Sequence, residues 1–258
     1  MRPSHVGILL RSTIFNVLFY ITTFVLMVIF LPVLVMPARA TIWLARLWGR
    51  VSVWLLHVIC GTHVEFRGLE NLPSQAVIIA PKHQSFLETF ALLVHVHYFS
   101  YVLKRELTWI PFFGWLLLTA KQIAIDRSSG RAALAQVIDA TKACFARGQS
   151  LFIFPEGTRR PVGAPPVYKG GVGFVYEATG ALCVPVALNT GLFWPRRKFL
   201  RFPGRCVIEF LAPIEPGLSR EQFMQVLQAR LEPATDALVS EACARAPWLA
   251  PLSKPAAA

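Results

Sequence analysis

The first 60 residues contain two apolar stretches that differ in pattern. Residues 12–38 carry no charged side chain, and the apolar run from Ile14 to Met36 is interrupted only by three polar residues and one proline. At about 1.5 Å per helical residue, this run is long enough to cross a bilayer. A secretory signal peptide is the alternative, and Ala38-Arg39-Ala40 resembles a cleavage site. Because the apolar part of a signal peptide is only about 7–15 residues long, the pattern favours a retained membrane helix.

A second helix is predicted over residues 40–60, where large apolar side chains recur at helical spacing. They are Trp43, Leu44, Leu47, Trp48, Val51, Trp54, Leu55 and Val58. Arg46 and Arg50 lie between them, and tryptophan with arginine on one helix is typical of a membrane interface. Three arrangements stay open. The two helices form a hairpin in one leaflet, the first spans while the second lies flat, or the second simply packs on the rest of the protein.

From about residue 62, short apolar runs alternate with helical patterns, which predicts an α/β domain with a mixed central sheet flanked by helices. The expected strands cover residues 76–80, 100–104, 122–125, 151–154, 184–189 and 206–211. The expected helices cover residues 85–96, 131–147, 171–179 and 220–244. We therefore divide the chain into membrane-anchoring helices (1–60), an α/β domain (61–246) and a flexible tail rich in proline and alanine (247–258).

Composition favours contact with lipid over contact with nucleic acid. Of the 258 residues, 55% are hydrophobic and 16% are charged, and the formal net charge is +12. The first acidic residue is Glu65, so the apolar N-terminal part is purely cationic. This pairing suits anionic lipid headgroups, and no interleaved basic and aromatic pattern of an RNA-binding sheet occurs. We expect membrane lipids as partners and no nucleic acid; a basic nucleic-acid-binding protein held at the membrane is the alternative.

Several common kinds of site find no support in the sequence. Five scattered cysteines without a C-x-x-C motif predict buried free thiols in a reducing compartment, not a disulfide framework or a zinc site. The phosphate loop G-x-x-x-x-G-K-[ST] and the hydrolase elbow G-x-S-x-G are both absent from the sequence. His95 and His97 form an H-x-H pair with no evident further metal ligand. Attention therefore turns to the polar segments that follow predicted strands.

The first polar turn follows the strand at residues 76–80 and contains His83 and Glu88. Polar residues at the carboxyl end of a strand in an α/β sheet are well placed for a site. In one continuous helix these two residues would lie about 140° apart around the axis. With His83 in the loop and Glu88 on the first helical turn, the loop can fold back and join them. The carboxylate then fixes the imidazole tautomer and leaves the other nitrogen as a base. A surface histidine beside a helix N-terminal glutamate is the plainer alternative.

A second polar turn reads Pro-Glu-Gly-Thr-Arg-Arg at residues 155–160. Gly157 permits close backbone approach, Thr158 offers a hydroxyl, and Arg159 presents a planar fork that matches phosphate oxygens. A third stretch begins with Lys104 and Arg105, at the end of the strand expected over residues 100–104, and continues into a strongly apolar segment. This order suits a site with a charged end beside an apolar wall. An exposed basic turn and a buried helix with a charged flank are the alternatives.

In this order the stretches resemble the glycerolipid acyltransferase family, specifically the bacterial 1-acyl-sn-glycerol-3-phosphate acyltransferases, over residues 61–216. The family's first motif is a histidine, four residues and an acid, and matches residues 83–88. Its third motif, Phe-Pro-Glu-Gly-Thr-Arg, stands unaltered at residues 154–159. Its second block resembles residues 104–115, and its fourth, an apolar strand with a proline, resembles residues 184–187.

The resemblance implies roles for individual residues. His83 would remove the proton from an acceptor hydroxyl as it attacks an acyl thioester, and Glu88 would orient the imidazole and stabilise its protonated form. The commoner acid in this motif is aspartate, so Glu88 is a departure that some bacterial members share. The residues implied to hold the acceptor phosphate or to shape its pocket are Lys104, Arg159, Glu156, Gly157 and Thr158.

The implied reaction transfers a fatty acyl group from acyl-CoA or acyl-acyl carrier protein to the sn-2 hydroxyl of lysophosphatidic acid, giving phosphatidic acid for phospholipid synthesis. The donor is a substrate, so no bound cofactor is expected, and no metal is needed because a thioester is already activated. The implied location is the bacterial inner (plasma) membrane, with the domain facing the cytoplasm. Other acceptors stay open, namely glycerol 3-phosphate, another lysophospholipid or a lyso-aminolipid, as does a non-catalytic lipid-binding protein on the same fold.

Overall fold

A computed structural model describes residues 3–126 and 130–253. Seven strands in this part of the chain form one sheet in the order β1-β7-β6-β2-β5-β3-β4. They are β1 (Thr62–Arg67), β2 (Ile78–Pro81), β3 (Phe99–Lys104), β4 (Ile123–Ile125), β5 (Ser150–Phe152), β6 (Cys183–Leu188) and β7 (Gly204–Phe210). Strands β2 to β6 run parallel, β7 is antiparallel to β6, and β1 pairs with β7 in parallel. The expected mixed sheet is confirmed.

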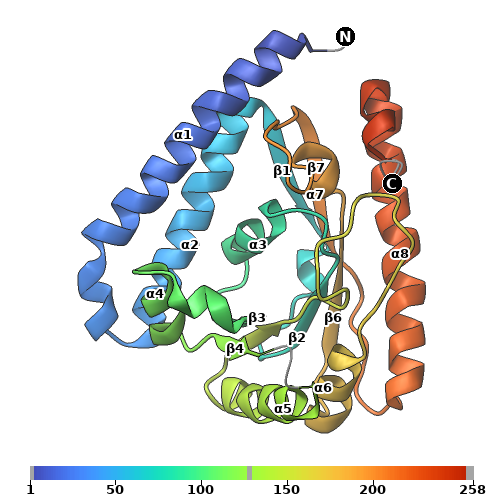
Figure 1. The fold of residues 1–258 in the computed structure, drawn as a ribbon. Coiled ribbons are helices and arrows are strands. Elements are labelled where there is room, and N and C mark those ends of the chain that lie inside the picture. The colour runs from blue at the N-terminus through green and yellow to red at the C-terminus, as the bar shows by residue number, and fades with distance from the viewer. Residues whose placement is uncertain (1–2, 127–129, 254–258) are drawn as a thin grey trace.

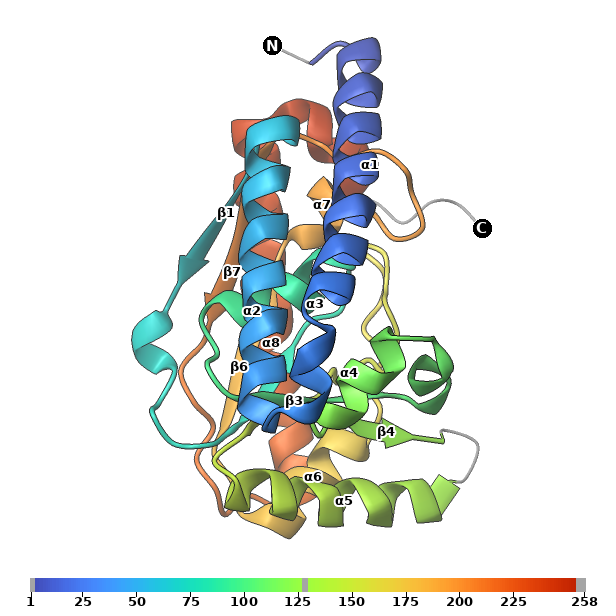
Figure 2. The same ribbon diagram turned by 90° about the vertical axis from the view of Figure 1, so that its left-hand side faces the viewer.

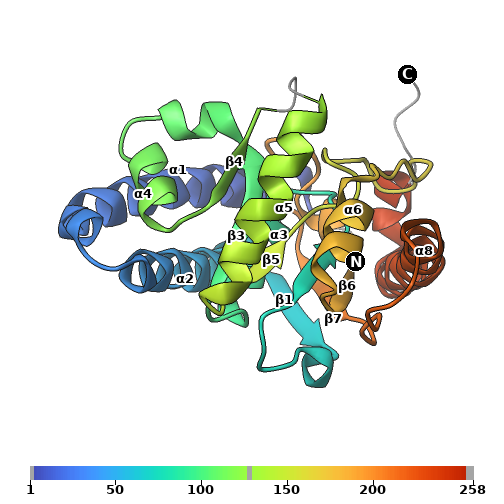
Figure 3. The same ribbon diagram turned by 90° about the horizontal axis from the view of Figure 1, so that it is seen from below.

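Helices flank this sheet (Figure 1). They are α1 (His5–Ile29), α2 (Ala38–Leu55), α3 (Leu87–Ala91), α4 (Phe113–Thr119), α5 (Gly130–Ala146), α6 (Gly171–Thr179), α7 (Thr190–Phe193) and α8 (Arg220–Arg245). Seen from below, α1 and α2 lie on one side of the sheet and α8 lies on the other (Figure 3). The expected helical cover is confirmed.

The core has two parts because successive side chains of a strand point to opposite faces of the sheet. In β2, Ile79 packs with the side chains from α1, α2 and α3. Its neighbours Ile78 and Ala80 pack instead with α5, α6 and α8. All four residues of β2 and all six of β6 are buried, as befits central strands covered on both faces.

The strands expected from the sequence all occur, with ends shifted by one or two residues. The edge strand β1 was missed, although its polar side chains alternate along the strand and only Thr62 is buried. The helix expected over residues 85–96 is shorter: α3 ends at Ala91 and a 3₁₀ turn, Leu92–Val94, follows. The short helix α4 was not expected either. In it Gly114 is needed, because a Cβ there would lie 2.1 Å from the Thr108 carbonyl oxygen.

The two N-terminal helices run side by side along one flank of the domain (Figure 2). The first begins earlier than its uncharged run, because Ser4 caps it by accepting a hydrogen bond from the Gly7 N–H. It also ends earlier: Pro32 cannot continue an α-helix, and the 3₁₀ turn Leu31–Val35 leads to α2. By length and composition both helices qualify as candidate membrane spans.

Part of the expected flexible tail is packed. Residues Pro247–Ser253 form a 3₁₀ helix, and Leu249 is only 1% exposed. Trp248 packs against Phe202, with ring centroids 5.9 Å apart. Apolar burial of these two side chains holds the segment against the core, which corrects the tail prediction for residues 247–253; the last five residues lie outside the described part of the chain.

Candidate active site

The polar segments singled out in the sequence meet along one edge of the sheet, which is formed by the carboxyl-terminal ends of its parallel strands. Strands β2, β3, β5 and β6 are parallel, so their carboxyl ends share this edge. His83 follows β2, the turn containing Arg159 follows β5, Thr190 follows β6, and Lys104 ends β3. This is the edge at which open α/β sheets place their sites.

The structure joins His83 to Glu88. The imidazole Nδ1 lies 3.0 Å from Glu88 Oε1. Because α3 begins only at Leu87, residues 83–86 form a loop that folds back over the first helical turn. The histidine is thereby joined to an acid five positions further on, as the sequence analysis expected.

Glu88 is a fully buried carboxylate with four hydrogen-bond partners. Besides His83, its Oε1 accepts bonds from the backbone N–H groups of Gln84 at 2.9 Å and Ser85 at 2.7 Å. Its Oε2 accepts the Thr190 hydroxyl at 2.7 Å. When this carboxylate is ionised it only accepts hydrogen bonds, and a neutral imidazole beside it then carries its proton on Nδ1 and presents the Nε2 lone pair. Thr190 was missed because its only signal was its position directly after the strand at 184–189.

The second polar turn holds the histidine loop in place. The Phe154 ring stacks on the His83 ring with centroids 3.9 Å apart. Glu156 accepts the His83 backbone N–H at 2.8 Å, and the Arg160 N–H donates to the His83 carbonyl oxygen at 2.7 Å. The Glu156 carboxylate, implied above to shape a phosphate pocket, is therefore directed at the histidine backbone.

Lys82 links this turn to helix α8. Its side chain is 5% exposed, and its Nζ lies 2.8 Å from both Glu156 Oε1 and Glu232 Oε1. Tyr168 donates its hydroxyl to the same Glu232 oxygen at 2.6 Å. Burial, followed by the bond to Glu232, raises the pKa of Tyr168 well above its usual value. No local pattern predicts this network, since α8 is remote along the chain.

Arg159 is the cation that lies beside the histidine loop. Its guanidinium lies 5.4 Å from the centroid of the Phe86 ring. Burial lowers the pKa of Arg159, the nearby Glu88 raises it, and Arg196 and Arg197 lower it further, so three guanidinium groups share one field. An arginine that remains charged beside further positive groups is suited to a phosphate.

The remaining implied phosphate residues differ in their surroundings. Gly157 has φ +64°, a left-handed conformation that favours glycine in this turn, while Thr158 is exposed. Lys104 lies on the same sheet edge, but β5 separates its strand from β2. Its side chain is 55% exposed, and its ammonium pairs with Glu106 at 2.6 Å. The structure thus groups Arg159 with the histidine loop and places Lys104 further along the edge.

The cysteines fit the expectation of free thiols. Four are buried and Cys243 is half-buried, and all five are unpaired. Burial raises the pKa of the Cys144 thiol to about 12, so this group stays protonated and unreactive. Cys144 is therefore not a candidate nucleophile.

Comparison with known proteins agrees with this geometry. The profile of the family described as Acyltransferase matches residues 63–189, the segment that carries the histidine loop and the arginine turn. Fold and site together thus define an acyltransferase. A 1-acyl-sn-glycerol-3-phosphate acyltransferase of Pseudomonas aeruginosa is 37% identical over 239 residues, which cover 91% of this chain and 91% of the relative. The chain belongs to the 1-acyl-sn-glycerol-3-phosphate acyltransferase family.

More distant relatives share the same description. A mouse 1-acyl-sn-glycerol-3-phosphate acyltransferase alpha is 26% identical, covering 75% of this chain and 73% of the relative. The crystal structure of the 1-acyl-sn-glycerophosphate (LPA) acyltransferase PlsC from Thermotoga maritima superposes with a TM-score of 0.75 at 22% identity, covering 89% of this chain and 96% of that one. The structural likeness establishes the fold. Together with the two apolar helices, the family indicates membrane association.

Proposed function

We propose that this protein transfers a fatty acyl group from an acyl thioester to the sn-2 hydroxyl of lysophosphatidic acid and so makes phosphatidic acid. The observation that carries the proposal is the His83–Glu88 pair, 3.0 Å apart, beside Arg159 in a chain that is 37% identical to a 1-acyl-sn-glycerol-3-phosphate acyltransferase. The imidazole provides a base, and the arginine provides a partner for the acceptor's phosphate.

In this mechanism His83 Nε2 takes the proton of the acceptor hydroxyl as its oxygen attacks the thioester carbonyl carbon. The new C–O bond forms, the C–S bond breaks, and the proton passes from the imidazolium to the departing thiolate. Glu88 stabilises the imidazolium through Nδ1 while its other bonds hold the carboxylate still. Arg159 fixes the phosphate and thereby the hydroxyl. Lys104 is proposed to contact the same phosphate once the acceptor is bound.

The donor is proposed to be acyl-CoA or acyl-acyl carrier protein, used as a substrate with no resident cofactor. Both carry the acyl group on the same kind of thioester, so the chemistry at His83 is common to them. Parallel assays with the two donors decide between them.

The protein is proposed to lie on the cytoplasmic side of the bacterial inner membrane, with the α1–α2 hairpin in one leaflet. The inward face of α1 carries Ser12 and Asn16, which hydrogen-bond to Arg201 of the domain. Its outward face exposes apolar side chains, among them Leu10, Ile14, Val17, Ile21, Phe24, Val25 and Val28. Polar groups turned to protein and apolar groups turned outward suit a helix that faces lipid. Protease added to intact cells should leave the domain uncut, and cleavage would contradict this orientation.

The acceptor is tested most directly by mass spectrometry of the products formed from a panel. The panel contains lysophosphatidic acid, glycerol 3-phosphate, another lysophospholipid and a lyso-aminolipid, each offered with the same acyl thioester. We expect acylation of lysophosphatidic acid to exceed that of the others at subsaturating concentration. Preference for another member would replace the acceptor named here, and no acyl transfer to any of them would remove the proposal.

A further inference from the structure

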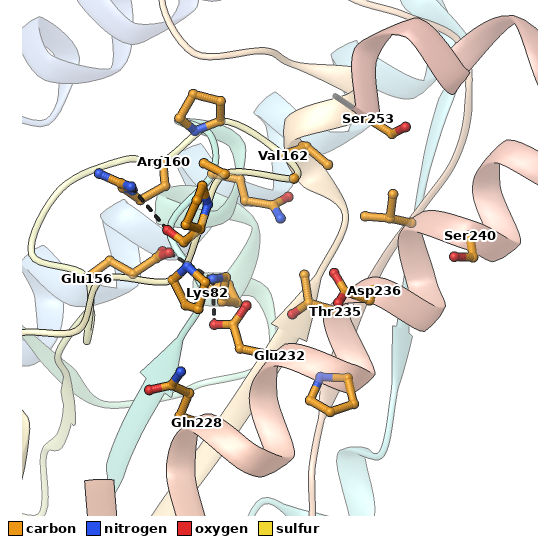
Figure 4. A pocket seen from close by; sticks show the side chains of 18 of the residues that line it. Lys82, Glu156, Arg160, Val162, Gln228, Glu232, Thr235, Asp236, Ser240 and Ser253 are labelled. Atoms are coloured by element: carbon orange, nitrogen blue, oxygen red, sulfur yellow. Dashed lines mark hydrogen bonds and ion pairs between the residues drawn. The ribbon is translucent and has the colours of Figure 1, made fainter. Parts of the chain in front are cut away.

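Helix α8 reaches the histidine loop through one charged side chain, although it lies outside the segment matched by the family profile. Glu232 Oε1 accepts Lys82 Nζ at 2.8 Å (Figure 4). Lys82 also bonds to Glu156 Oε1 at 2.8 Å, and Glu156 Oε2 accepts the His83 backbone N–H at 2.8 Å. The chain of contacts from α8 to the histidine backbone is therefore Glu232, Lys82, Glu156, His83.

This network consists of one cation between two anions, and the inner pair, Lys82 and Glu156, is almost fully buried. Lys82 is 5% exposed and Glu156 is 1% exposed, whereas Glu232 is 20% exposed at the outer end. Removing one carboxylate leaves the buried Lys82 ammonium only partly neutralised, which is energetically unfavourable. The ammonium is then expected to move closer to the carboxylate that remains. Here the remaining carboxylate is Glu156, the group that also holds the His83 N–H. Loss of Glu232 should therefore shift the Glu156 carboxylate toward Lys82 and so move the His83 backbone that it holds.

A cavity of about 590 Å³ lies next to the network, between α8 and the loop after the arginine turn (Figure 4). It is lined by Glu232 and by Thr235, whose buried hydroxyl lacks a hydrogen-bond partner in the described structure. Open space rather than packed side chains thus separates the loop from this part of α8. Beside the cavity, polar contacts join α8 to this region: Glu232 pairs with Lys82 and accepts the Tyr168 hydroxyl. On its other side, α8 packs on the sheet through Leu227 and Leu231.

We propose that Glu232 is a positioning residue for the acyl transfer, which sets the place of the His83 loop through Lys82 and Glu156. This inference rests on the proposed function. Glu232 contacts Lys82 and Tyr168 and reaches the imidazole only indirectly, so its removal should slow the chemical step and leave acceptor binding alone. Small displacements of a catalytic group are costly, since about 1 Å can cost roughly 10²-fold in rate.

The test measures kcat and KM of the full-length protein in detergent micelles, with acyl-CoA as donor and lysophosphatidic acid as acceptor. Glu232→Gln should lower kcat about tenfold while KM stays within about twofold. Asp236→Asn is the matched control, because Asp236 lies one turn further along α8 and lines the same cavity. Its kcat should equal that of the wild type. The unfolding midpoint of each variant separates a misplaced loop from a misfolded protein.

A double variant gives a second readout that a general structural role would not reproduce. If Glu232 acts through Lys82, then Lys82→Met with Glu232→Gln should have the kcat of Lys82→Met alone. Independent, multiplied losses would overturn the inference, as would a raised KM or an equal loss in Asp236→Asn. A wild-type kcat in Glu232→Gln beside an inactive His83→Ala would overturn it while the proposed function stands. An active His83→Ala would remove the function itself.

Discussion

Replacement of Glu88 by glutamine removes charge from the site while keeping its shape. The amide oxygen can still accept the bonds of His83, Gln84 and Ser85, and the Thr190 hydroxyl can turn to accept from the amide nitrogen. What is lost is the attraction between the carboxylate and the imidazolium that forms as the proton arrives. Glu88→Gln is therefore a test of electrostatics at nearly constant geometry.

The size of the effect follows from the 3.0 Å contact between Nδ1 and Oε1. Two unit charges about 4 Å apart attract by about 4 kcal/mol at an effective dielectric constant near 20. The retained neutral hydrogen bond offsets roughly 1 kcal/mol of this. The barrier should then rise by about 3 kcal/mol, which is a loss of roughly 10²-fold in kcat. This lies inside the range of about 10²–10⁴ for general-base assistance.

Glu88→Asp provides the matched comparison. Aspartate keeps the charge but shortens the arm by about 1.5 Å, so it cannot hold all four partners, which now lie at 2.7–3.0 Å, within hydrogen-bond distance. We expect its kcat to fall between those of Glu88→Gln and the wild type. His83→Ala should be at least as slow as Glu88→Gln, and the double variant should be little slower than His83→Ala alone.

The assay is the initial rate of thiol release from acyl-CoA in the presence of lysophosphatidic acid, divided by the amount of folded protein in the membrane fraction. A rate near that of the wild type in Glu88→Gln would show that the carboxylate charge plays no part in the reaction. A rate near that of the wild type in His83→Ala would refute the whole assignment of the site.

Three further outcomes are expected. Arg159→Ala should raise the KM for a phosphate-bearing acceptor roughly 10–150-fold, and Lys104→Ala should raise it less because that exposed ammonium already pairs with Glu106; unchanged steady-state kinetics in both would refute the phosphate assignment. The protein should stay with membranes through a high-salt wash and need detergent for release, since salt screens headgroup attraction but not apolar insertion, and release by salt alone would contradict the lipid-facing hairpin. Hydrogen bonds from Arg67 lower the pKa of both Glu65 and Glu241, so this stabilisation is present above about pH 4.3 and lost as pH falls through the lower folded-state values. Arg67→Met should therefore lower the unfolding midpoint at pH 7 more than at pH 3, and an equal shift at both would argue against the ion pairs.

Much of the fold follows from local pattern. Periods of two and of 3.6 residues reveal whether a segment buries one face, so strands such as β6 and helices such as α6 could be placed nearly to the residue. Edge strand β1 was missed although its polar side chains alternate, and short helix α4 was missed because seven residues make only about two helical turns. The extent of α3 also escaped, since it depends on where the loop around Ser85 bonds to Glu88 and Trp194.

In the candidate site, too, some features follow from local sequence motifs and others depend on contacts between distant segments. Sequence motifs alone reveal which chemical groups are present and that His83, Glu88 and Arg159 follow strands, because short motifs keep their residues close along the chain. The folded chain is needed to see that Thr190 donates a hydrogen bond to Glu88 from 102 positions away and that Glu232 pairs with Lys82 from 150 positions away. Such pairs leave no period in the sequence. They form because parallel strand ends and a covering helix meet at one edge, where buried charges must find partners.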